Sequence, residues 1–312
     1  MFKKLSNKNL LIIIAVLGAI VLLVNYLDSS KSNRTFREEL VSIDSAAVTQ
    51  ILLYPKATEH AEVKLEKIGD SWQVNLPNGK KASVPVDRIQ GLIIELQKIK
   101  PMRLAATKRS RWSDFKTDSS GTRVKVMEGE QTTLDIIIGR FDFNQQARSA
   151  TSFVRLYDDS SVYAVDGFLE LSFNQGHDSF RDKGLIKTTA STIMQVNFVY
   201  PDSAFSIVKN GDRWLLDTLE LDSTAVAGYL NTLAYTNGNK FIDDPDPAFI
   251  GSATYSLRIE TMDVGTITID AYVDSSNSIV NSSQNPESYF DGNVNNLVKT
   301  LFVGPSKFIP DS

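Results

Sequence analysis

The chain has 312 residues, of which 42% are hydrophobic and 22% charged, and its 33 basic and 37 acidic side chains leave a net charge of −4. This composition is typical of folded protein and excludes a largely disordered chain. The sequence contains no cysteine. That absence excludes disulfides, zinc–thiolate sites, iron–sulfur clusters, cysteine nucleophiles and a lipid-modified cysteine.

An apolar segment over residues 10–27 is the first element along the chain. Three lysines and no acidic residue precede it: Lys3, Lys4 and Lys8. Eighteen helical residues span about 27 Å, close to the ~30 Å of a bilayer's hydrocarbon core. Lysines ahead of such a helix favour a cytoplasmic N-terminus. We therefore predict a single-pass protein of the bacterial inner membrane. Residues 1–9 are cytoplasmic, residues 10–27 form a transmembrane helix that binds the lipid bilayer, and the bulk of the chain is periplasmic.

A cleaved signal peptide is the alternative for this segment. It requires a shorter apolar region followed by small residues at a cleavage site. Here the unbroken apolar run, from Leu10 to Val24, is long, and Asn25, Tyr26, Leu27 and Asp28 follow it. The pattern therefore favours an uncleaved anchor.

The remaining residues exceed the usual size of one hydrophobic core, which predicts two domains. Charge divides unevenly between them. Residues 28–187 are nearly neutral, whereas residues 188–312 contain six basic and fifteen acidic side chains. Surface solubility is the favoured explanation of this asymmetry, and the orientation of a partner is the alternative.

Short strands and two helices are expected along the exported part. A polar spacer over residues 28–45 comes first. Residues 89–99 place apolar side chains at helical spacing before Pro101, and residues 226–233 do so again. Alternating or short apolar runs predict strands at residues 51–54, 63–65, 71–74, 123–126, 134–138, 153–156, 162–165, 197–200, 204–208, 213–216, 257–259 and 267–269.

Three local signatures recur in the same order and predict an internal duplication. The pairs are Tyr54-Pro55 with Tyr200-Pro201, Gly69-Asp70-Ser71-Trp72 with Gly211-Asp212-Arg213-Trp214, and Tyr163 before Asp166-Gly167 with Tyr289 before Asp291-Gly292. The expected fold class is α+β: an N-terminal transmembrane helix followed by two repeated domains of mostly antiparallel sheet packed with amphipathic helices. The expected domains are residues 46–187 and 188–312. Each repeated tryptophan is expected to pack its sheet against its own helix.

Sequence motifs of catalysis are missing. The two histidines, His60 and His177, have no HExxH or paired-histidine spacing, and no GxSxG, Walker or GxGxxG motif occurs. We therefore predict no catalytic, cofactor-binding or metal-ligating residue, no cofactor, and a protein that is not an enzyme. Hydrolysis by a pair of carboxylates stays open as an alternative.

Two charged segments have competing interpretations. The acidic loop at residues 243–246 lacks the spacing and glycine of an EF-hand, so its flanking prolines favour a stiff connector, while calcium binding stays open. Seven basic residues lie between Lys98 and Lys116, with Trp112 and Phe115 among them. Export argues against a nucleic-acid partner. A solvated rim is favoured over binding of anionic lipid or an acidic partner.

Several short segments resemble a known family. They are Trp112-Ser113-Asp114-Phe115, Asp135-Ile136-Ile137-Ile138-Gly139, Phe153-Val154-Arg155-Leu156, Val162-Tyr163-Ala164-Val165-Asp166-Gly167, Phe180-Arg181-Asp182-Lys183, Phe241-Ile242-Asp243 and Ser282-Ser283-Gln284-Asn285-Pro286. With these the chain resembles the domain of unknown function 4340 (DUF4340) family, over roughly residues 48–308. The resemblance implies a bacterial membrane-anchored envelope protein of repeated α+β domains that accompanies ABC transport systems related to gliding motility. It carries over no catalytic residue.

The expected function is therefore non-enzymatic. The anchor is expected to hold an accessory subunit beside an ABC-type transporter, where the periplasmic part binds an envelope protein partner. A glycan- or peptidoglycan-binding module is the alternative. It would use exposed aromatic side chains in a cleft between the lobes, such as Tyr235, Tyr255 or Tyr272.

Overall fold

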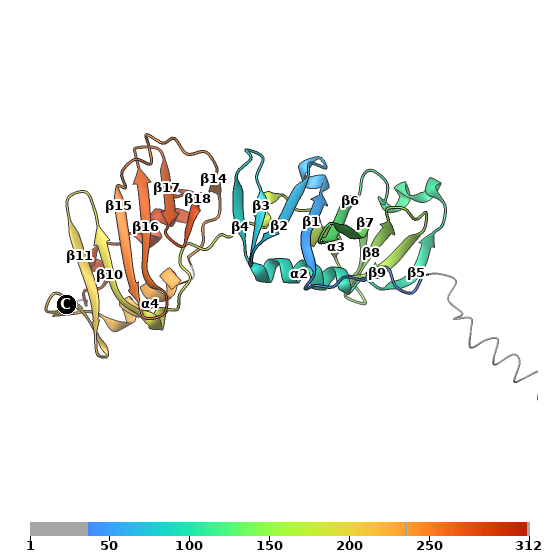
Figure 1. Ribbon diagram of the computed structural model, residues 1–312. Coiled ribbons are helices and arrows are strands. Elements are labelled where there is room, and N and C mark those ends of the chain that lie inside the picture. The colour runs from blue at the N-terminus through green and yellow to red at the C-terminus, as the bar shows by residue number, and fades with distance from the viewer. Residues whose placement is uncertain (1–36, 235, 311–312) are drawn as a thin grey trace, which may run out of the picture.

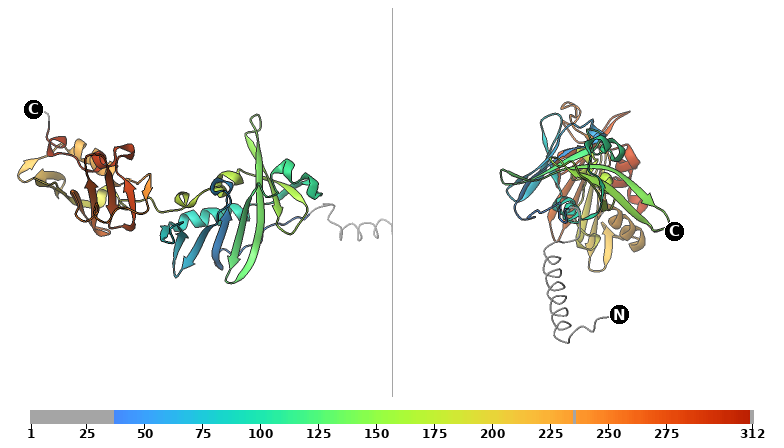
Figure 2. Two further views of the ribbon diagram at one scale, coloured as in Figure 1. Left: turned by 90° about the horizontal axis from the view of Figure 1, so that it is seen from above. Right: turned by 90° about the vertical axis from the view of Figure 1, so that its right-hand side faces the viewer.

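The computed structural model describes residues 37–234 and 236–310, and the predicted anchor at residues 10–27 lies outside them. Two lobes, each built on a nine-stranded antiparallel sheet, lie at the two ends of an elongated molecule (Figures 1 and 2). Within the described residues, no helix combines the length and the apolar character that crossing a membrane requires.

The first lobe contains the first nine strands and two short helices. The strands are β1 (Val48–Tyr54), β2 (Val63–Ile68), β3 (Ser71–Asn75), β4 (Lys81–Val84), β5 (Pro101–Ala106), β6 (Thr122–Glu128), β7 (Gln131–Asn144), β8 (Ser149–Leu156) and β9 (Val162–Asp166). The helices are α2 (Val86–Gln97) and α3 (Leu169–Phe173), and 3-10 turns occur at Lys56–Thr58, Arg109–Arg111, Ser113–Phe115 and His177–Ser179.

The second lobe repeats this plan after a 3-10 turn at Ala190–Thr192. Its strands are β10 (Ile193–Val199), β11 (Ala204–Asn210), β12 (Arg213–Leu216), β13 (Leu219–Glu220), β14 (Phe241–Ile242), β15 (Tyr255–Thr261), β16 (Gly265–Val273), β17 (Ser278–Ser282) and β18 (Asn285–Asp291). Its helices are α4 (Ser223–Ala234) and α5 (Leu297–Leu301), and 3-10 turns occur at Val294–Asn296 and Pro305–Lys307.

The two sheets have the same strand order. The first runs β4-β3-β2-β1-β6-β7-β8-β9-β5, and adding nine to each number gives the second, β13-β12-β11-β10-β15-β16-β17-β18-β14. The Gly-Asp-x-Trp signature falls at the equivalent place in the two sheets, because Trp72 pairs with Lys67 and Trp214 with Lys209. The tyrosines of the third signature do not, because Tyr163 pairs with Val154 whereas Tyr289 pairs with Asn281, which is not the equivalent of Val154. Each Gly-Asp pair turns one strand into the next, and each tryptophan lies on the strand that follows, β3 or β12. This shared order is what an internal duplication requires.

Each lobe has its own core between its sheet and one amphipathic helix. Trp72 is buried with the apolar face of α2, and Trp214 is buried with that of α4, which confirms the expected packing role of both tryptophans. Leu40 and Val41, from the expected spacer, are also buried in the first core. The expected α+β class overstates the helical share, because strands contain far more residues than helices in both lobes and the described helices are few and short.

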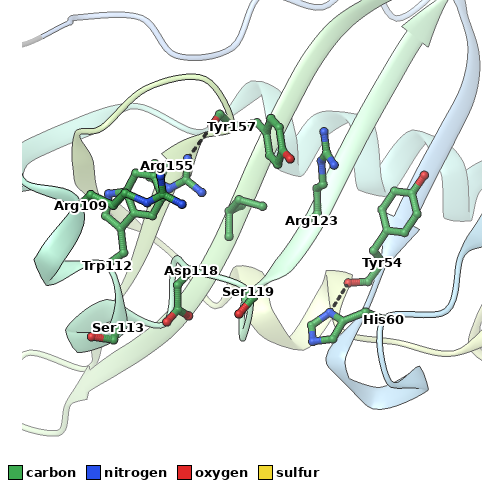
Figure 3. A pocket seen from close by; sticks show the side chains of 12 residues that line it. Tyr54, His60, Arg109, Trp112, Ser113, Asp118, Ser119, Arg123, Arg155 and Tyr157 are labelled. Atoms are coloured by element: carbon green, nitrogen blue, oxygen red, sulfur yellow. Dashed lines mark hydrogen bonds between the residues drawn. The ribbon is translucent and has the colours of Figure 1, made fainter.

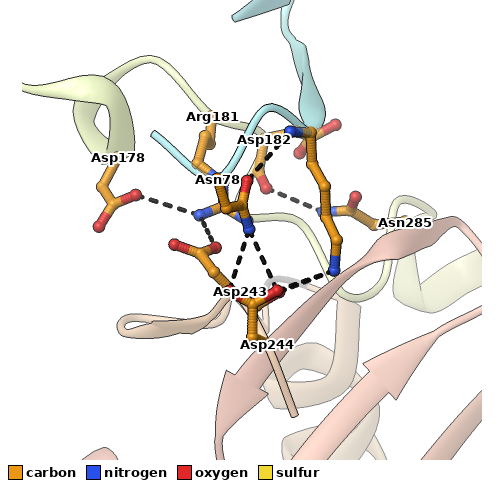
Figure 4. Close-up of polar contacts among 8 residues, drawn as sticks. Asn78, Asp178, Arg181, Asp182, Asp243, Asp244 and Asn285 are labelled. Carbon is orange, nitrogen blue, oxygen red and sulfur yellow. Dashed lines mark hydrogen bonds and ion pairs between the residues drawn. The ribbon is translucent and has the colours of Figure 1, made fainter. Parts of the chain in front are cut away.

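A buried arginine joins the two lobes (Figure 4). The side chain of Arg181, on the segment between the lobes, is 2% exposed, and its Nη1 lies 3.1 Å from Asp178 and 2.5 Å from Asp243 of the second lobe. Its guanidinium carbon lies 3.6 Å from the centre of the Phe241 ring. We call this arrangement the inter-lobe clamp. It ties the end of the first lobe to the strand β14 of the second.

The acidic loop serves the same junction. Lys80 and Asn78, in the turn between β3 and β4, bond the carboxylate of Asp244 at 3.0 and 3.2 Å. Asn285 of the second lobe donates to the carbonyl of Asp182 at 2.8 Å. Of the carboxylates considered for calcium, Asp243 and Asp244 therefore face cations and an amide of the first lobe, whereas Asp246 accepts a hydrogen bond from the backbone of Ala248. Nowhere in residues 37–234 and 236–310 do histidine and acidic side chains gather as a metal-binding group.

Candidate functional site

Four side chains form a row across the outer face of the first sheet. Strand pairing places Tyr54 of β1 opposite Arg123 of β6, Arg123 opposite Ile137 of β7, and Ile137 opposite Arg155 of β8. Residues paired across neighbouring strands point to the same face of a sheet. Their immediate neighbours, such as Val124, point to the core instead. The pairing therefore brings two arginines, two strands apart, onto the face away from the core.

The segment between β5 and β6 covers one end of this row. Its two 3-10 turns place Trp112 beside Arg155, and its backbone lies against β7 at Gly139. A Cβ atom at Gly139 would lie 2.1 Å from the carbonyl oxygen of Phe115, so only glycine permits this close approach.

Sheet and covering segment enclose a cavity of about 690 Å³ that we call the arginine–aromatic pocket (Figure 3). Its volume is typical of small-molecule sites. The lining residues are Tyr54, His60, Arg109, Trp112, Ser113, Asp118, Ser119, Gly121, Arg123, Ile137, Arg155 and Tyr157.

Arg155 is the buried charge of the pocket, with 4% of its surface exposed. Its Nε donates to the carbonyl of Thr117 at 3.0 Å, and its Nη1 donates to the carbonyls of Leu156, Tyr157 and Asp159. Its guanidinium carbon lies 3.7 Å from the centre of the Trp112 ring. Burial lowers the pKa of this guanidinium, but an arginine stays charged in a protein. In the described part of the chain, no carboxylate forms an ion pair with Arg155, and its Nη2 bonds nothing.

The other two arginines differ in how they are compensated. Arg123 forms a two-pronged ion pair with Asp135, at 2.8 and 2.6 Å, and stacks 3.4 Å from the centre of the Tyr157 ring. The hydrogen bonds to Asp135 raise the pKa of Arg123. Arg109 is exposed and lies 5.1 Å from the Trp112 ring, and its side chain forms no ion pair or hydrogen bond with another described residue.

The other two titratable side chains discussed for the pocket, Asp118 and His60, have different hydrogen-bond partners. Asp118 accepts hydrogen bonds from the backbone and hydroxyl of Ser120, at 3.1 and 2.6 Å, and the hydroxyl contact is the main cause of its lowered pKa. Nδ1 of His60 lies 3.3 Å from the carbonyl oxygen of Tyr54. The imidazole and the carboxylate thus have different partners, and no nucleophile–base pair faces the cavity from the described residues.

The second lobe does not repeat the pocket. The same register places Ser256 opposite Asp270, and Asp270 opposite Asn281, at the positions of Arg123, Ile137 and Arg155. Ser256 donates a 2.7 Å hydrogen bond to Asp270. The duplicated sheet therefore folds with neutral and acidic side chains where the first carries arginines.

Sequence reasoning found part of this site. The basic stretch from Lys98 to Lys116 contributes Arg109 and Trp112, whereas Arg111 on the same turn pairs with Asp114 at 2.9 Å. Arg123 and Arg155 were not singled out as site residues. The available signal was the charged Arg155 inside the apolar run Phe153-Val154-Arg155-Leu156.

Two of the tyrosines expected to bind glycan, Tyr255 and Tyr272, do not line the arginine–aromatic pocket. Tyr255 is half-buried and packs against Tyr200 and Phe302, with ring centres 5.5 Å from each. Tyr272 is also half-buried, and Tyr235 lies outside the described residues. His177 is half-buried in a turn beside α3, and it does not line the pocket.

We expect stability to fall at high pH as Tyr54 ionises. Burial raises the pKa of Tyr54 to about 12, and the 2.7 Å hydrogen bond that its hydroxyl donates to Glu62 acts in the same direction. An unfolded tyrosine ionises near pH 10. The folded state therefore holds the hydroxyl proton of Tyr54 more tightly than the unfolded state does. The contribution of this proton to the free energy of unfolding is complete below about pH 10 and is lost as the pH rises to about 12.

Urea unfolding between these pH values measures this loss. Tyr200, whose pKa burial also raises to about 12, contributes over the same range. Tyr54→Phe should therefore remove part of the pH dependence and Tyr200→Phe another part. Unfolding curves of Tyr54→Phe that track the unmodified protein over this range would contradict the assignment to Tyr54.

Comparison with known proteins gives one match. The family described as "Domain of unknown function (DUF4340)" matches residues 72–253. This range begins on β3, includes the arginine–aromatic pocket except its Tyr54 and His60, and ends before β15. No curated protein and no solved structure matches the chain.

Proposed function

The chain belongs to the DUF4340 family, and from this premise we propose that it is a non-enzymatic, partner-binding accessory subunit of an ABC-type transport system. Residues 10–27 anchor it in the bacterial inner membrane, and the two lobes face the periplasm. The lysine-led apolar segment supports the anchor and orientation. The resemblance of the sequence segments to the family supports the transporter association.

The arginine–aromatic pocket is the observation that carries the binding role. It combines guanidinium groups, aromatic rings and a cavity of small-molecule volume with no paired acid and base among its described lining residues. Such a surface recognises charged or planar groups and does not transfer protons. The inter-lobe clamp supports the same role, because it holds the second lobe at a defined place relative to this surface.

Recovery of partners from membranes tests the proposal. A tag after Ser312 on the full chain, followed by purification in a nonionic detergent, should recover a component of an ABC transporter. The matched pair Arg109→Met and Arg111→Met separates specific from general effects, because Arg109 lines the pocket and Arg111 pairs with Asp114 outside it. Recovery should fall with Arg109→Met and persist with Arg111→Met. Purification of the unmodified chain without any transporter component would count against the proposal.

Glycan or peptidoglycan binding ranks second. Trp112 and Tyr157 line the pocket, as aromatic rings do in many sugar sites, but arginine guanidinium groups already stack on them. A pull-down with purified cell wall decides between the two functions. Retention of the full chain on cell wall, together with no transporter component in the membrane purification, would replace the accessory-subunit proposal.

A further inference from the structure

We propose that the arginine–aromatic pocket binds an oxyanion, a carboxylate or a phosphate, that is carried on a ligand of small-molecule size. The inference rests on the part of the proposed function that makes the pocket a binding site. It does not depend on the identity of the transport partner.

Within the described chain, two of the three arginines in the pocket have no ion-pair partner. Among its described lining residues are three arginines and one carboxylate, Asp118, whose Oδ1 is already bonded to Ser120. Asp135 forms an ion pair with Arg123, but no carboxylate forms an ion pair with Arg109 or Arg155 within the described chain, although Asp135 and Asp159 interact electrostatically with Arg155. A buried charge in a protein is normally paired. The guanidinium groups that lack a described ion-pair partner therefore favour an anion between them.

The unused hydrogen-bond donors point the same way. The Nη2 of Arg155 and the Nη1 of Arg123 make no hydrogen bond with the described residues, and the whole guanidinium of Arg109 is unused. Figure 3 shows Arg123 and Arg155 at separate places in the row, with Arg109 and Trp112 beside Arg155. A guanidinium donates several hydrogen bonds in one plane, and carboxylate and phosphate oxygens match that geometry.

The size and floor of the pocket indicate more than an inorganic ion. Its volume of about 690 Å³ far exceeds one oxyanion. Ile137 forms apolar floor between the two arginines, and the Tyr157 ring borders it. An oxyanion at the arginines leaves this floor for the carbon body of the same ligand.

A purely structural role of the arginines accounts for fewer of these observations than anion binding does. Arg155 ties the covering segment to the end of β8 through its Nε and Nη1, but that role requires neither its Nη2 nor Arg109. The second lobe shows that the sheet itself does not need these charges. Ser256 and Asn281 occupy the positions of Arg123 and Arg155 in the same strand order.

Trp112 provides a local reporter for the test. The full chain, labelled with 5-fluorotryptophan in nonionic detergent, should give fluorine resonances from its 3 tryptophans, and Trp112→Phe assigns the one in the pocket. Trp72 and Trp214 lie in the two cores and act as internal controls. Inorganic phosphate and succinate are titrated separately against sodium chloride of equal ionic strength. Comparing the two anions distinguishes a phosphate ligand from a carboxylate ligand.

We expect phosphate or succinate to shift the Trp112 resonance, with a Kd on the order of 1 mM. Chloride should not shift the Trp112 resonance comparably, and none of the anions should shift the resonances of Trp72 and Trp214 comparably. Arg109→Met should weaken binding about tenfold, because a charge-assisted hydrogen bond is lost, and Arg111→Met should change it less than twofold. Arg109→Met should leave the fold intact, because the Arg109 side chain is exposed and forms no hydrogen bond or ion pair with another described residue. Arg155→Met, if folded, should abolish the shift.

Two results would overturn the inference. One is the absence of a Trp112 shift with both anions, and the other is equal weakening by Arg109→Met and Arg111→Met, which indicates general electrostatic attraction. If either result is obtained and a transporter component is still recovered from membranes, the oxyanion site is overturned and the transporter partnership is not. A specific Trp112 shift with no transporter component recovered supports the oxyanion site and contradicts the transporter partnership.

Discussion

Replacing Gly139 by alanine should destabilise the first lobe by about 3 kcal/mol, because it forces the covering segment away from β7. The new Cβ would meet the carbonyl oxygen of Phe115 at 2.1 Å and the Cγ2 of Thr117 at 2.8 Å. The first of these is a backbone atom, so no change of rotamer relieves the contact. The segment is also held by the hydrogen bond from Arg155 to the carbonyl of Thr117.

Urea unfolding of the full chain measures this effect, with Gly91→Ala as the matched control. Gly91 lies on α2, and a Cβ there meets no atom within 4 Å. Alanine at that helical position should stabilise by about 0.5 to 1 kcal/mol. Gly139→Ala should also move the fluorine resonance of Trp112, because the segment that carries Trp112 is displaced. Equal stability of the Gly139→Ala and unmodified proteins would show that β7 and the segment do not lie this close.

Replacing Arg181 by methionine should loosen the junction between the lobes at a cost of about 2 to 3 kcal/mol. Methionine keeps an apolar stem beside Phe241 but loses the charge that holds Asp243. Asp243 and Asp178 are 38% and 66% exposed, so water can solvate both carboxylates once the arginine is gone. The loss is therefore smaller than that of a fully buried pair.

Trypsin cleavage in the native state measures this loosening at Lys183 and Lys187, which lie on the segment between the lobes. The backbone of this segment is bonded to the second lobe, through Lys183 to Gly238 and Leu185 to Thr236. Arg181→Met should increase cleavage here several-fold. The control is Lys80→Met, because the side chains of the Lys80–Asp244 pair are 61% and 67% exposed and water already solvates both charges. Similar cleavage of both variants would mean that Arg181 does not hold the lobes together.

The sequence predicted the local elements well and the helical share less well. The strands around residues 51–54 and 257–259 are present, because alternating apolar and polar side chains indicate a half-buried strand. The helix that begins at Val86 ends at Gln97, shortly before Pro101. The two helices with clear apolar periodicity, α2 and α4, each lie beside a sheet of nine strands. Their clear periodicity gave helices more weight in the predicted fold class than their share of the chain supports.

The site was predicted only where its residues are neighbours in sequence. Arg109 and Trp112 belong to a visible basic and aromatic stretch. Arg123 and Arg155 are 32 positions apart by their numbers, and Ile137 separates them in the sheet. Their shared face follows from strand register, and a slip of one residue would turn either side chain to the core. No local pattern specifies that register between strands.

The acidic loop illustrates the same limit. Its clustered carboxylate oxygens left calcium binding open as the alternative to a stiff connector. The cations that meet them, Arg181 and Lys80, come from distant parts of the chain. Local composition therefore identified a charged group correctly but not its partner.

The amino-acid sequence by itself determined the strand-rich composition of the chain, its repeated signatures, the two tryptophans of the cores and the membership suggested by its short motifs, because each depends on residues close together in the chain. Only the tertiary structure decided that the arginines of β6 and β8 share one pocket, that the second lobe lacks it, and that Arg181 joins the lobes. Those contacts are made between residues far apart in sequence, and their geometry is fixed by strand register and by close packing at Gly139.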